Sequence, residues 1–65
     1  MLIVNGSQME VERGMLLGDL LIEMELDTQP CAVEVNKELV PYKERSHVVL
    51  NDGDNVEIVT LVGGG

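Results

Sequence analysis

The sequence predicts an α+β domain: a mixed sheet of four to five strands with one helix packed across it, in the order β-β-α-β-β-β. Three observations support this prediction. Several short stretches alternate between apolar and polar residues, as half-buried strands do, and one stretch has helical periodicity instead. The length of 65 residues allows one small domain, which buries only ~60% of the surface that its unfolded chain exposes. Its apolar residues are aliphatic side chains and four methionines, without Phe or Trp, and small aliphatic side chains in one layer suit a sheet covered by one helix.

The first two strands are predicted as a hairpin. Residues 2–4 are apolar, and the Asn-Gly pair at residues 5–6 is a strong hairpin signal because both residue types accept positive φ. Residues 8–12 then alternate strictly, which places Met9 and Val11 on one face and the acidic residues on the other.

The helix is predicted from a single apolar stripe. Leu17, Leu20, Leu21 and Met24 follow at i, i+3, i+4 and i+7. No residue that caps helices well precedes the stripe, so the start of the helix is open. Residues 27–30, Asp-Thr-Gln-Pro, are expected to end it.

The second half of the chain predicts three more strands. Residues 31–36 alternate again and lead through a turn at 36–38 into a short strand at 39–40, which Pro41 stops. Residues 42–46 are polar and predict an irregular or single-turn connection.

A strong turn at residues 51–54 precedes the last strand, residues 55–62. The first and last strands both need burial, so we expect them side by side in the middle of the sheet. We expect residues 1–62 to form a single domain and residues 63–65 to form a flexible glycine tail.

The last strand has an unusual apolar pattern. Val56 and Ile58 face one way and Glu57 faces the other, yet Val59 and Leu61 continue on the side of Glu57. These two side chains indicate either a central strand covered on both faces or an exposed apolar patch that docks a partner. One helix covers only one face of a sheet, which favours the patch.

Gly63, Gly64 and Gly65 follow this strand with no linker between them and the apolar run that ends at Val62. Without Cβ atoms such a segment is slim and flexible, and three extended residues project a terminal carboxylate by roughly 10 Å. The pattern suits a carboxyl group that another enzyme activates. A frayed end and a tag remnant are the alternatives.

Charge limits the choice of partners. The formal net charge is −8, from 12 Asp and Glu against 4 Lys and Arg. Nucleic acid and anionic membranes are disfavoured, because phosphate binding depends on Lys and Arg, whereas a basic protein surface would be attracted. No stretch is typical of a signal peptide or a membrane span, and a single cysteine fits a reducing cytoplasm.

No side chain predicts a catalytic or metal site. Cys31 begins a strand on the face of Val33 and Val35, which favours a buried small side chain. His47 has no Cys or His at a ligand spacing. We therefore expect no bound metal or cofactor. A domain this small also leaves little room for a substrate cavity beside its core, so we expect a protein co-substrate rather than an enzyme.

Several motifs together point to a known family. They are Val4-Asn5-Gly6, Leu20-Leu21, Val33-Glu34-Val35-Asn36, Leu39-Val40-Pro41, Asp52-Gly53-Asp54 and Gly64-Gly65. With the short length and the strand order, the chain resembles the ubiquitin-like β-grasp sulfur carriers, most closely the ThiS-like carriers of thiamin thiazole biosynthesis. Two positions depart from the pattern: many members have Gly where Lys37 stands, and many have a basic residue followed by Trp where Tyr42 and Lys43 follow the proline.

The resemblance implies a role in three steps. A ThiF-like adenylating enzyme uses ATP to activate the Gly65 carboxylate, sulfur from a cysteine desulfurase persulfide gives a thiocarboxylate, and thiazole synthase receives that sulfur. Gly63 and Gly64 supply reach, while Val59, Leu61 and Val62 form the partner interface.

Three other functions remain open. One is protein conjugation in the manner of ubiquitin, in which the tail would attach to a lysine. The chain could carry sulfur to a different acceptor, as the small subunit of molybdopterin synthase and the carriers of amino-acid sulfuration do. It could also be a non-covalent β-grasp adaptor, in which Val59 and Leu61 matter and the glycines do not.

Overall fold

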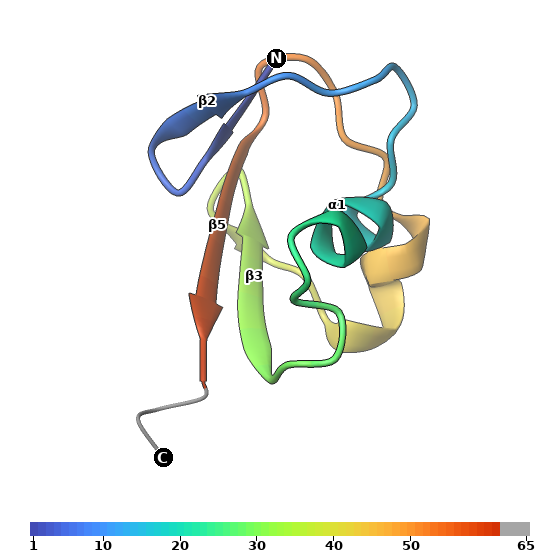
Figure 1. Cartoon of the computed structure of the whole chain (residues 1–65), viewed down its shortest axis with the longest axis vertical. Coiled ribbons are helices and arrows are strands. Elements are labelled where there is room, and N and C mark those ends of the chain that lie inside the picture. The colour runs from blue at the N-terminus through green and yellow to red at the C-terminus, as the bar shows by residue number, and fades with distance from the viewer. Residues whose placement is uncertain (62–65) are drawn as a thin grey trace.

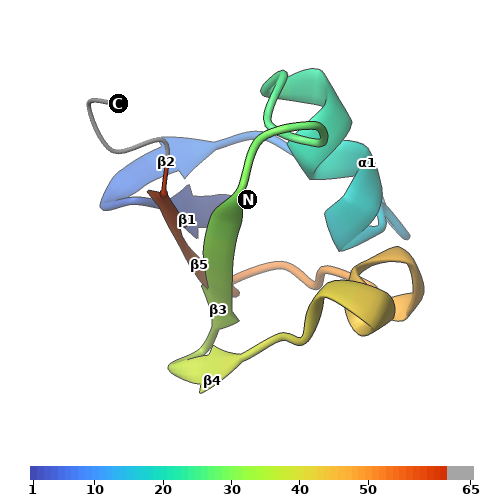
Figure 2. The same ribbon diagram turned by 90° about the horizontal axis from the view of Figure 1, so that it is seen from below.

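In the computed structural model, residues 1–61 are described, and they form one five-stranded sheet with both helices on the same side of it (Figures 1 and 2). The elements are β1 (Leu2–Val4), β2 (Ser7–Met9), α1 (Leu17–Glu23), β3 (Cys31–Val35), β4 (Glu38–Leu39), the 3-10 helix η1 (Tyr42–His47) and β5 (Asn55–Thr60). Val62 and Gly63–Gly65 lie outside the described residues, so the division into a domain and a tail stays a prediction.

The strand order is β2-β1-β5-β3-β4. β1 and β5 are parallel and the other three pairings are antiparallel. The predicted mixed sheet, its single α-helix and the central placement of the first and last strands are thus confirmed. Within residues 1–61, neither helix has the length and apolarity that a membrane crossing requires.

The first hairpin turns at Asn5 (φ 49°) and Gly6 (φ 84°), as the Asn-Gly pair predicts. The prediction that its second strand runs over residues 8–12 was wrong, because β2 ends at Met9. Met9 pairs with Leu2, the first residue of β1, so no backbone partner remains for the residues that follow. Val11 still packs against the core from outside the strand.

The helix begins at Leu17 without a side-chain cap. A backbone contact takes the place of the missing cap: the Leu17 N–H donates to the Val48 carbonyl at 2.8 Å, and the Leu50 N–H donates to the Met15 carbonyl at 2.8 Å. The first of these bonds satisfies one of the free N–H groups that every helix start leaves open.

The helix ends earlier than residues 27–30, so that prediction was wrong. α1 stops at Glu23, and Glu25 adopts φ 61°, the left-handed conformation that usually falls to glycine. The Glu25 N–H donates to the Ile22 carbonyl (2.9 Å) and the Leu26 N–H to the Leu21 carbonyl (2.8 Å). This pair of bonds is a Schellman motif, which closes the helix before the proline is reached.

The second hairpin turns at Asn36 (φ 51°) and Lys37 (φ 71°). β4 lies one residue earlier than the predicted strand at 39–40, since Val40 leaves the strand. Val40 is nevertheless buried, and its N–H donates to the Val33 carbonyl at 2.8 Å.

The core is aliphatic and lies between the sheet and α1. Its buried members are Leu2, Val4, Leu17, Leu20, Leu21, Cys31, Val33, Val40, Leu50, Val56 and Ile58. Three of the four methionines, Met9, Met15 and Met24, are partly buried and pack against this core, and Met1 is 40% exposed.

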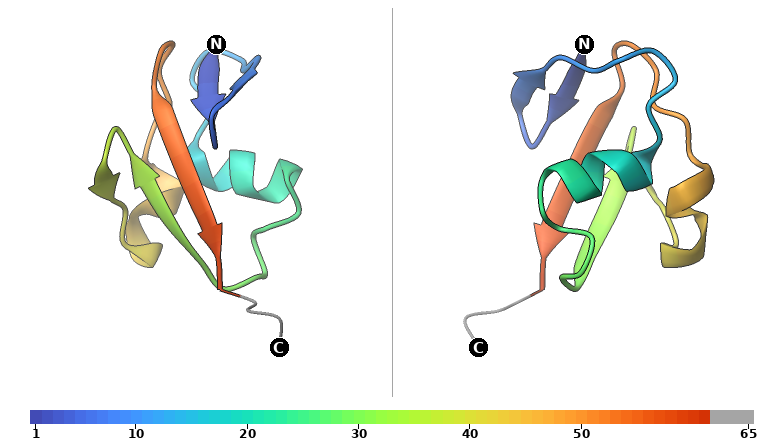
Figure 3. Two further views of the ribbon diagram at one scale, coloured as in Figure 1. Left: turned by 90° about the vertical axis from the view of Figure 1, so that its left-hand side faces the viewer. Right: turned by 45° about the vertical axis from the view of Figure 1, so that its right-hand side comes forward.

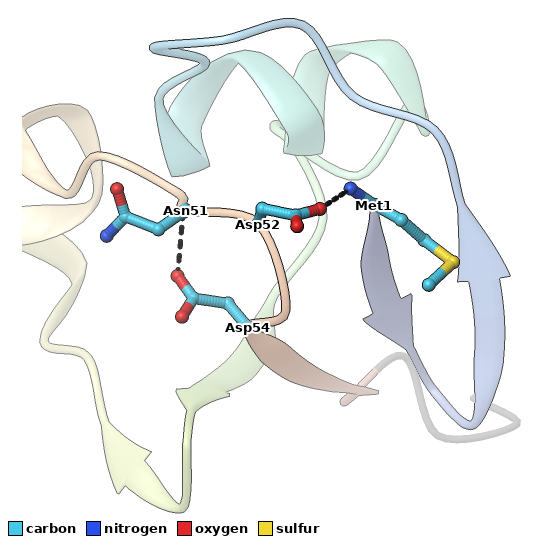
Figure 4. A network of polar contacts seen from close by, with 4 residues as sticks. All are labelled: Met1, Asn51, Asp52 and Asp54. Atoms are coloured by element: carbon cyan, nitrogen blue, oxygen red, sulfur yellow. Dashed lines mark hydrogen bonds and ion pairs between the residues drawn. The ribbon is translucent and has the colours of Figure 1, made fainter.

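The turn before β5 is fixed by polar contacts to the start of β1 (Figure 4). The Met1 amino group pairs with the Asp52 carboxylate, and the Gly53 N–H donates to the Met1 carbonyl at 2.7 Å. Across the turn the Asn51 N–H donates to an oxygen of the Asp54 carboxylate at 2.8 Å. β5 therefore enters the sheet from a turn that is tied to its parallel neighbour.

Candidate functional site

The face of the sheet opposite α1 is uncovered along β5 (Figure 3, left). Val56 and Ile58 point into the core, and Val59 and Leu61 are each 60% exposed. This exposure excludes a strand covered on both faces for residues 55–61, and that the two side chains dock a partner stays a prediction. We call the side of the sheet that carries Glu57, Val59 and Leu61 the free face.

β5 is held on both sides up to the patch. On the β1 side, the Asn5 N–H donates to the Val56 carbonyl (2.9 Å), and the Asn5 side-chain oxygen accepts from the Ile58 N–H (2.7 Å). β1 ends at Val4, so the Asn5 side chain extends the parallel ladder by one step beyond the strand. Leu61, past the end of β5, still donates its N–H to the Pro30 carbonyl at 2.8 Å.

The register shows which side chains surround the patch. Ala32 pairs with Val59 across β3 and β5, Glu34 pairs with Glu57 at the next step on the same face, and Leu39 of β4 pairs with Glu34. Leu39 is 66% exposed. Sequence reasoning missed that Glu34 and Glu57 are paired one step from Val59, and that Leu39 lies on the same face beside Glu34. The alternation of apolar and polar residues in β3 and β5 indicates which side chains share a face. Which residues of the two strands lie opposite each other is known only from the structure.

Cys31 lies on the other side of the sheet and is buried, as predicted, with 8% exposure. The sequence places no basic residue close to it, but the fold does. The Arg45 guanidinium donates to the Cys31 carbonyl at 2.5 Å and lies 3.6 Å from the Cys31 sulfur, with its carbon 5.2 Å from the centre of the Tyr42 ring. Arg45 thus joins η1 to the start of β3, which is a packing role.

The chemistry of side chains is sparse in the described part of the chain. His47 is exposed at the end of η1. Among residues 1–61, no three His, Cys, Asp or Glu side chains are placed to hold a metal ion together. Gly63, Gly64, Gly65 and Val62, which the sequence predicts as tail and interface, lie outside these residues.

The strand order, the mixed sheet and the single helix define a ubiquitin-like β-grasp domain with one open sheet face. A solved structure agrees. The thiamine biosynthesis protein (ThiS) from Geobacter metallireducens superposes with a TM-score of 0.78 at 28% identity, over 98% of this chain and 97% of that one.

The particular family follows from the sequence comparison. The sequence model of the ThiS family matches residues 2–65. The sulfur carrier protein ThiS of Bacillus subtilis (strain 168) is 42% identical over 67 residues, covering the whole of both chains. This chain belongs to the ThiS family, the sulfur carrier proteins of thiamin biosynthesis.

A further relative is much longer. A thiazole synthase of Paramagnetospirillum magneticum (strain ATCC 700264 / AMB-1) is 41% identical over 64 residues, which cover 98% of this chain. The chain spans only 20% of the length of that protein.

Proposed function

We propose that this protein carries sulfur on its Gly65 carboxylate, which is adenylated, converted to a thiocarboxylate and used as the sulfur donor for the thiazole ring of thiamin. The observation that carries the proposal is the course of β5. This strand runs through the middle of the sheet and exposes Val59 on the free face; Leu61, just past its end, is equally exposed, and the three glycines begin two residues further along the sequence.

The chemistry explains why a glycine end suffices. A carboxylate is a poor electrophile, and its reaction with ATP gives an acyl-adenylate and pyrophosphate. AMP is then a good leaving group for attack by a persulfide sulfur, and a second thiol reduces the resulting acyl disulfide to the thiocarboxylate. Positioning and charge stabilisation for each step come from the partner enzymes, so the carrier itself is a co-substrate and not an enzyme.

The partners are assigned by this sequence of reactions. A ThiF-like adenylating enzyme holds the ATP, so no cofactor stays on the carrier. A cysteine desulfurase supplies the persulfide, and thiazole synthase accepts the sulfur. The relative named thiazole synthase contains a segment similar to this chain, which supports thiazole as the destination over molybdopterin or an amino acid. The thiol chemistry requires a reducing compartment, which supports the cytoplasm as the location of the carrier.

Docking is assigned to the free face. Val59 and Leu61 are exposed apolar side chains of the free face, and Val62 and the three glycines follow them in the sequence. Apolar side chains that stay exposed together mark interaction sites. A partner that covers them would hold the body of the carrier while Gly63 and Gly64 extend toward its active site.

Intact-mass spectrometry tests the carrier chemistry. The purified chain is incubated with ATP, a ThiF-like adenylating enzyme, a cysteine desulfurase, cysteine and a thiol reductant. We expect the mass of the C-terminal peptide to rise by the difference between sulfur and oxygen, and the rise to disappear when ATP is left out. A chain whose mass stays unchanged, beside a control carrier that is converted in the same mixture, would contradict the proposal.

Deletion of Gly65 separates the carrier from the adaptor. A carrier without its reacting residue loses all sulfur transfer, whereas a non-covalent adaptor keeps both its binding and its effect. Substitution of Val59 by Asp is the converse variant, because it removes docking and leaves Gly65 in place.

A further inference from the structure

Two carboxylates face each other on the free face. Glu34 of β3 and Glu57 of β5 are directly paired in the antiparallel register, and both side chains are exposed. Side chains paired in this way have Cβ atoms about 4.5–5.5 Å apart, and like charges in such a pair destabilise the sheet. Glutamate is also disfavoured in strands. The pair therefore costs stability where Gln or Thr would not.

Nothing in the described chain neutralises this pair. Residues 1–61 include every Lys, Arg, Asp and Glu of the sequence, and their one salt bridge joins the Met1 amino group to Asp52. Arg45 is occupied on the opposite side of the sheet by Cys31 and Tyr42. The two carboxylates remain without an internal cation.

The pair is continuous with the apolar patch. The next step of the register brings Ala32 opposite Val59, about 7 Å further along the strand toward the glycines. Leu39 flanks Glu34 on the other side and is 66% exposed. The free face thus presents an apolar area at Val59 toward the C-terminal end of β5. The two paired glutamates lie next to this area, further from that end.

We propose that Glu34 and Glu57 together receive one Arg or Lys side chain of the adenylating enzyme that acts on Gly65. This inference rests on the proposed function and extends it to the orientation of docking. An apolar patch alone lets the carrier rotate on its partner, whereas a cation held between two fixed carboxylates sets one direction. With that direction set, β5 points its C-terminal end at the enzyme's active site.

Charge complementarity selects this occupant. Two unpaired carboxylates attract a cation more strongly than one, and the body that carries them has a net charge of −8. Charged groups across an interface contribute mainly to the rate and specificity of association, and their effect falls as salt rises. The partner surface is therefore apolar at its centre, with an Arg or Lys at the border.

Substitutions that preserve shape test the proposal through two readouts. The variants are Glu34→Gln, Glu57→Gln and the double variant, with Glu23→Gln as the matched control. Glu23 is an exposed acid at the end of α1 and its substitution removes the same charge. Adenylation of each chain is followed by ATP–pyrophosphate exchange with the ThiF-like enzyme, and thermal unfolding is followed by circular dichroism.

We expect opposite effects on binding and on stability. Each single variant raises KM about 3- to 10-fold with kcat unchanged, and the double variant also flattens the rise of KM with salt. The same variants unfold at temperatures roughly 1–4 °C higher, because the like-charge pair is gone. Glu57→Lys should give the largest increase in KM, because the new lysine repels the partner's cation. It should also give the largest increase in unfolding temperature, because the lysine pairs with Glu34. Glu23→Gln changes KM less than about 2-fold.

The outcome that overturns the inference is a double variant with the KM and salt dependence of the unsubstituted chain. Calorimetric titration of the enzyme with chains that lack Gly65 separates this failure from a failure of the carrier chemistry. These chains dock and cannot react. If the Gly65-deleted chain binds the enzyme and its glutamine variants bind equally tightly, the cation assignment is wrong, even when Gly65 of the full chain is adenylated. If the glutamine variants bind more weakly, the assignment stands, whatever happens at Gly65.

Discussion

Substitution of Lys37 by glycine should stabilise the domain, because the second hairpin turn holds this residue at φ 71°. The residue before it is held by two hydrogen bonds. The Asn36 N–H donates to the Asn55 carbonyl at 2.7 Å, and the Asn36 side-chain oxygen accepts from the Asn55 N–H at 3.0 Å. These bonds fix the first residue of the turn, and Lys37 follows it in the left-handed conformation.

The gain can be worked from two opposing effects. The left-handed conformation costs a residue with a Cβ about 1–2 kcal/mol of folding free energy. Glycine avoids this cost, but its greater conformational freedom in the unfolded chain costs about 0.5–1 kcal/mol on folding. The difference leaves Lys37→Gly more stable by about 0.5–1 kcal/mol, which corresponds to a midpoint roughly 2–8 °C higher for a domain of this size.

Urea and thermal unfolding followed by circular dichroism measure this difference. Lys37→Gln is the matched control, since it removes the charge and keeps the Cβ. Gly6→Lys is the reciprocal variant: Gly6 has φ 84° and no heavy atom within 4 Å of an added Cβ, so conformation alone should lower its stability. The reasoning is refuted if Lys37→Gly unfolds at the same urea concentration as Lys37→Gln.

Three further outcomes are expected. Gly18→Ala should stabilise the domain by about 0.5–1 kcal/mol in urea unfolding, because alanine favours a helix more than glycine does. The added Cβ fits, since it would meet the Ser46 Cα at 3.5 Å, an ordinary contact; a lower stability would mean that η1 is displaced. Asn5→Gly should speed hydrogen exchange at the Ile58 amide about 10-fold or more through loss of its acceptor, with Asn5→Asp as control. Sodium chloride should raise the unfolding midpoint, since 12 acids share one salt bridge in residues 1–61; a flat response would show that the acids do not repel.

Local chemistry made much of the fold predictable. The Asn-Gly pair at residues 5–6, the stripe from Leu17 to Met24 and the alternation from Cys31 all produced the elements expected of them. The end of the helix was not predictable, because a left-handed position that usually carries glycine is filled by Glu25. The length of β2 depends on how much of β1 is available to pair, which periodicity within one strand does not contain.

The candidate site divides in the same way. The exposure of Val59 and Leu61 followed from a break in alternation along one strand. Glu34 and Glu57 lie opposite each other because of the register between two strands that are far apart in the sequence. Alternation does not determine this register, since a shift of two residues leaves every side chain on the same face. The contact of Arg45 with Cys31 depends on where η1 docks.

The central position of β5 also determines how the domain responds to mechanical load. A pull on the chain beyond Leu61 acts along the axis of a strand that is bonded to β1 on one side and β3 on the other. Such a pull loads those bonds in shear, all at once, instead of peeling them apart in succession. Under the proposed carrier function, a partner enzyme that holds the glycines would therefore draw or release the whole domain as one rigid unit, without separating β5 from its neighbours.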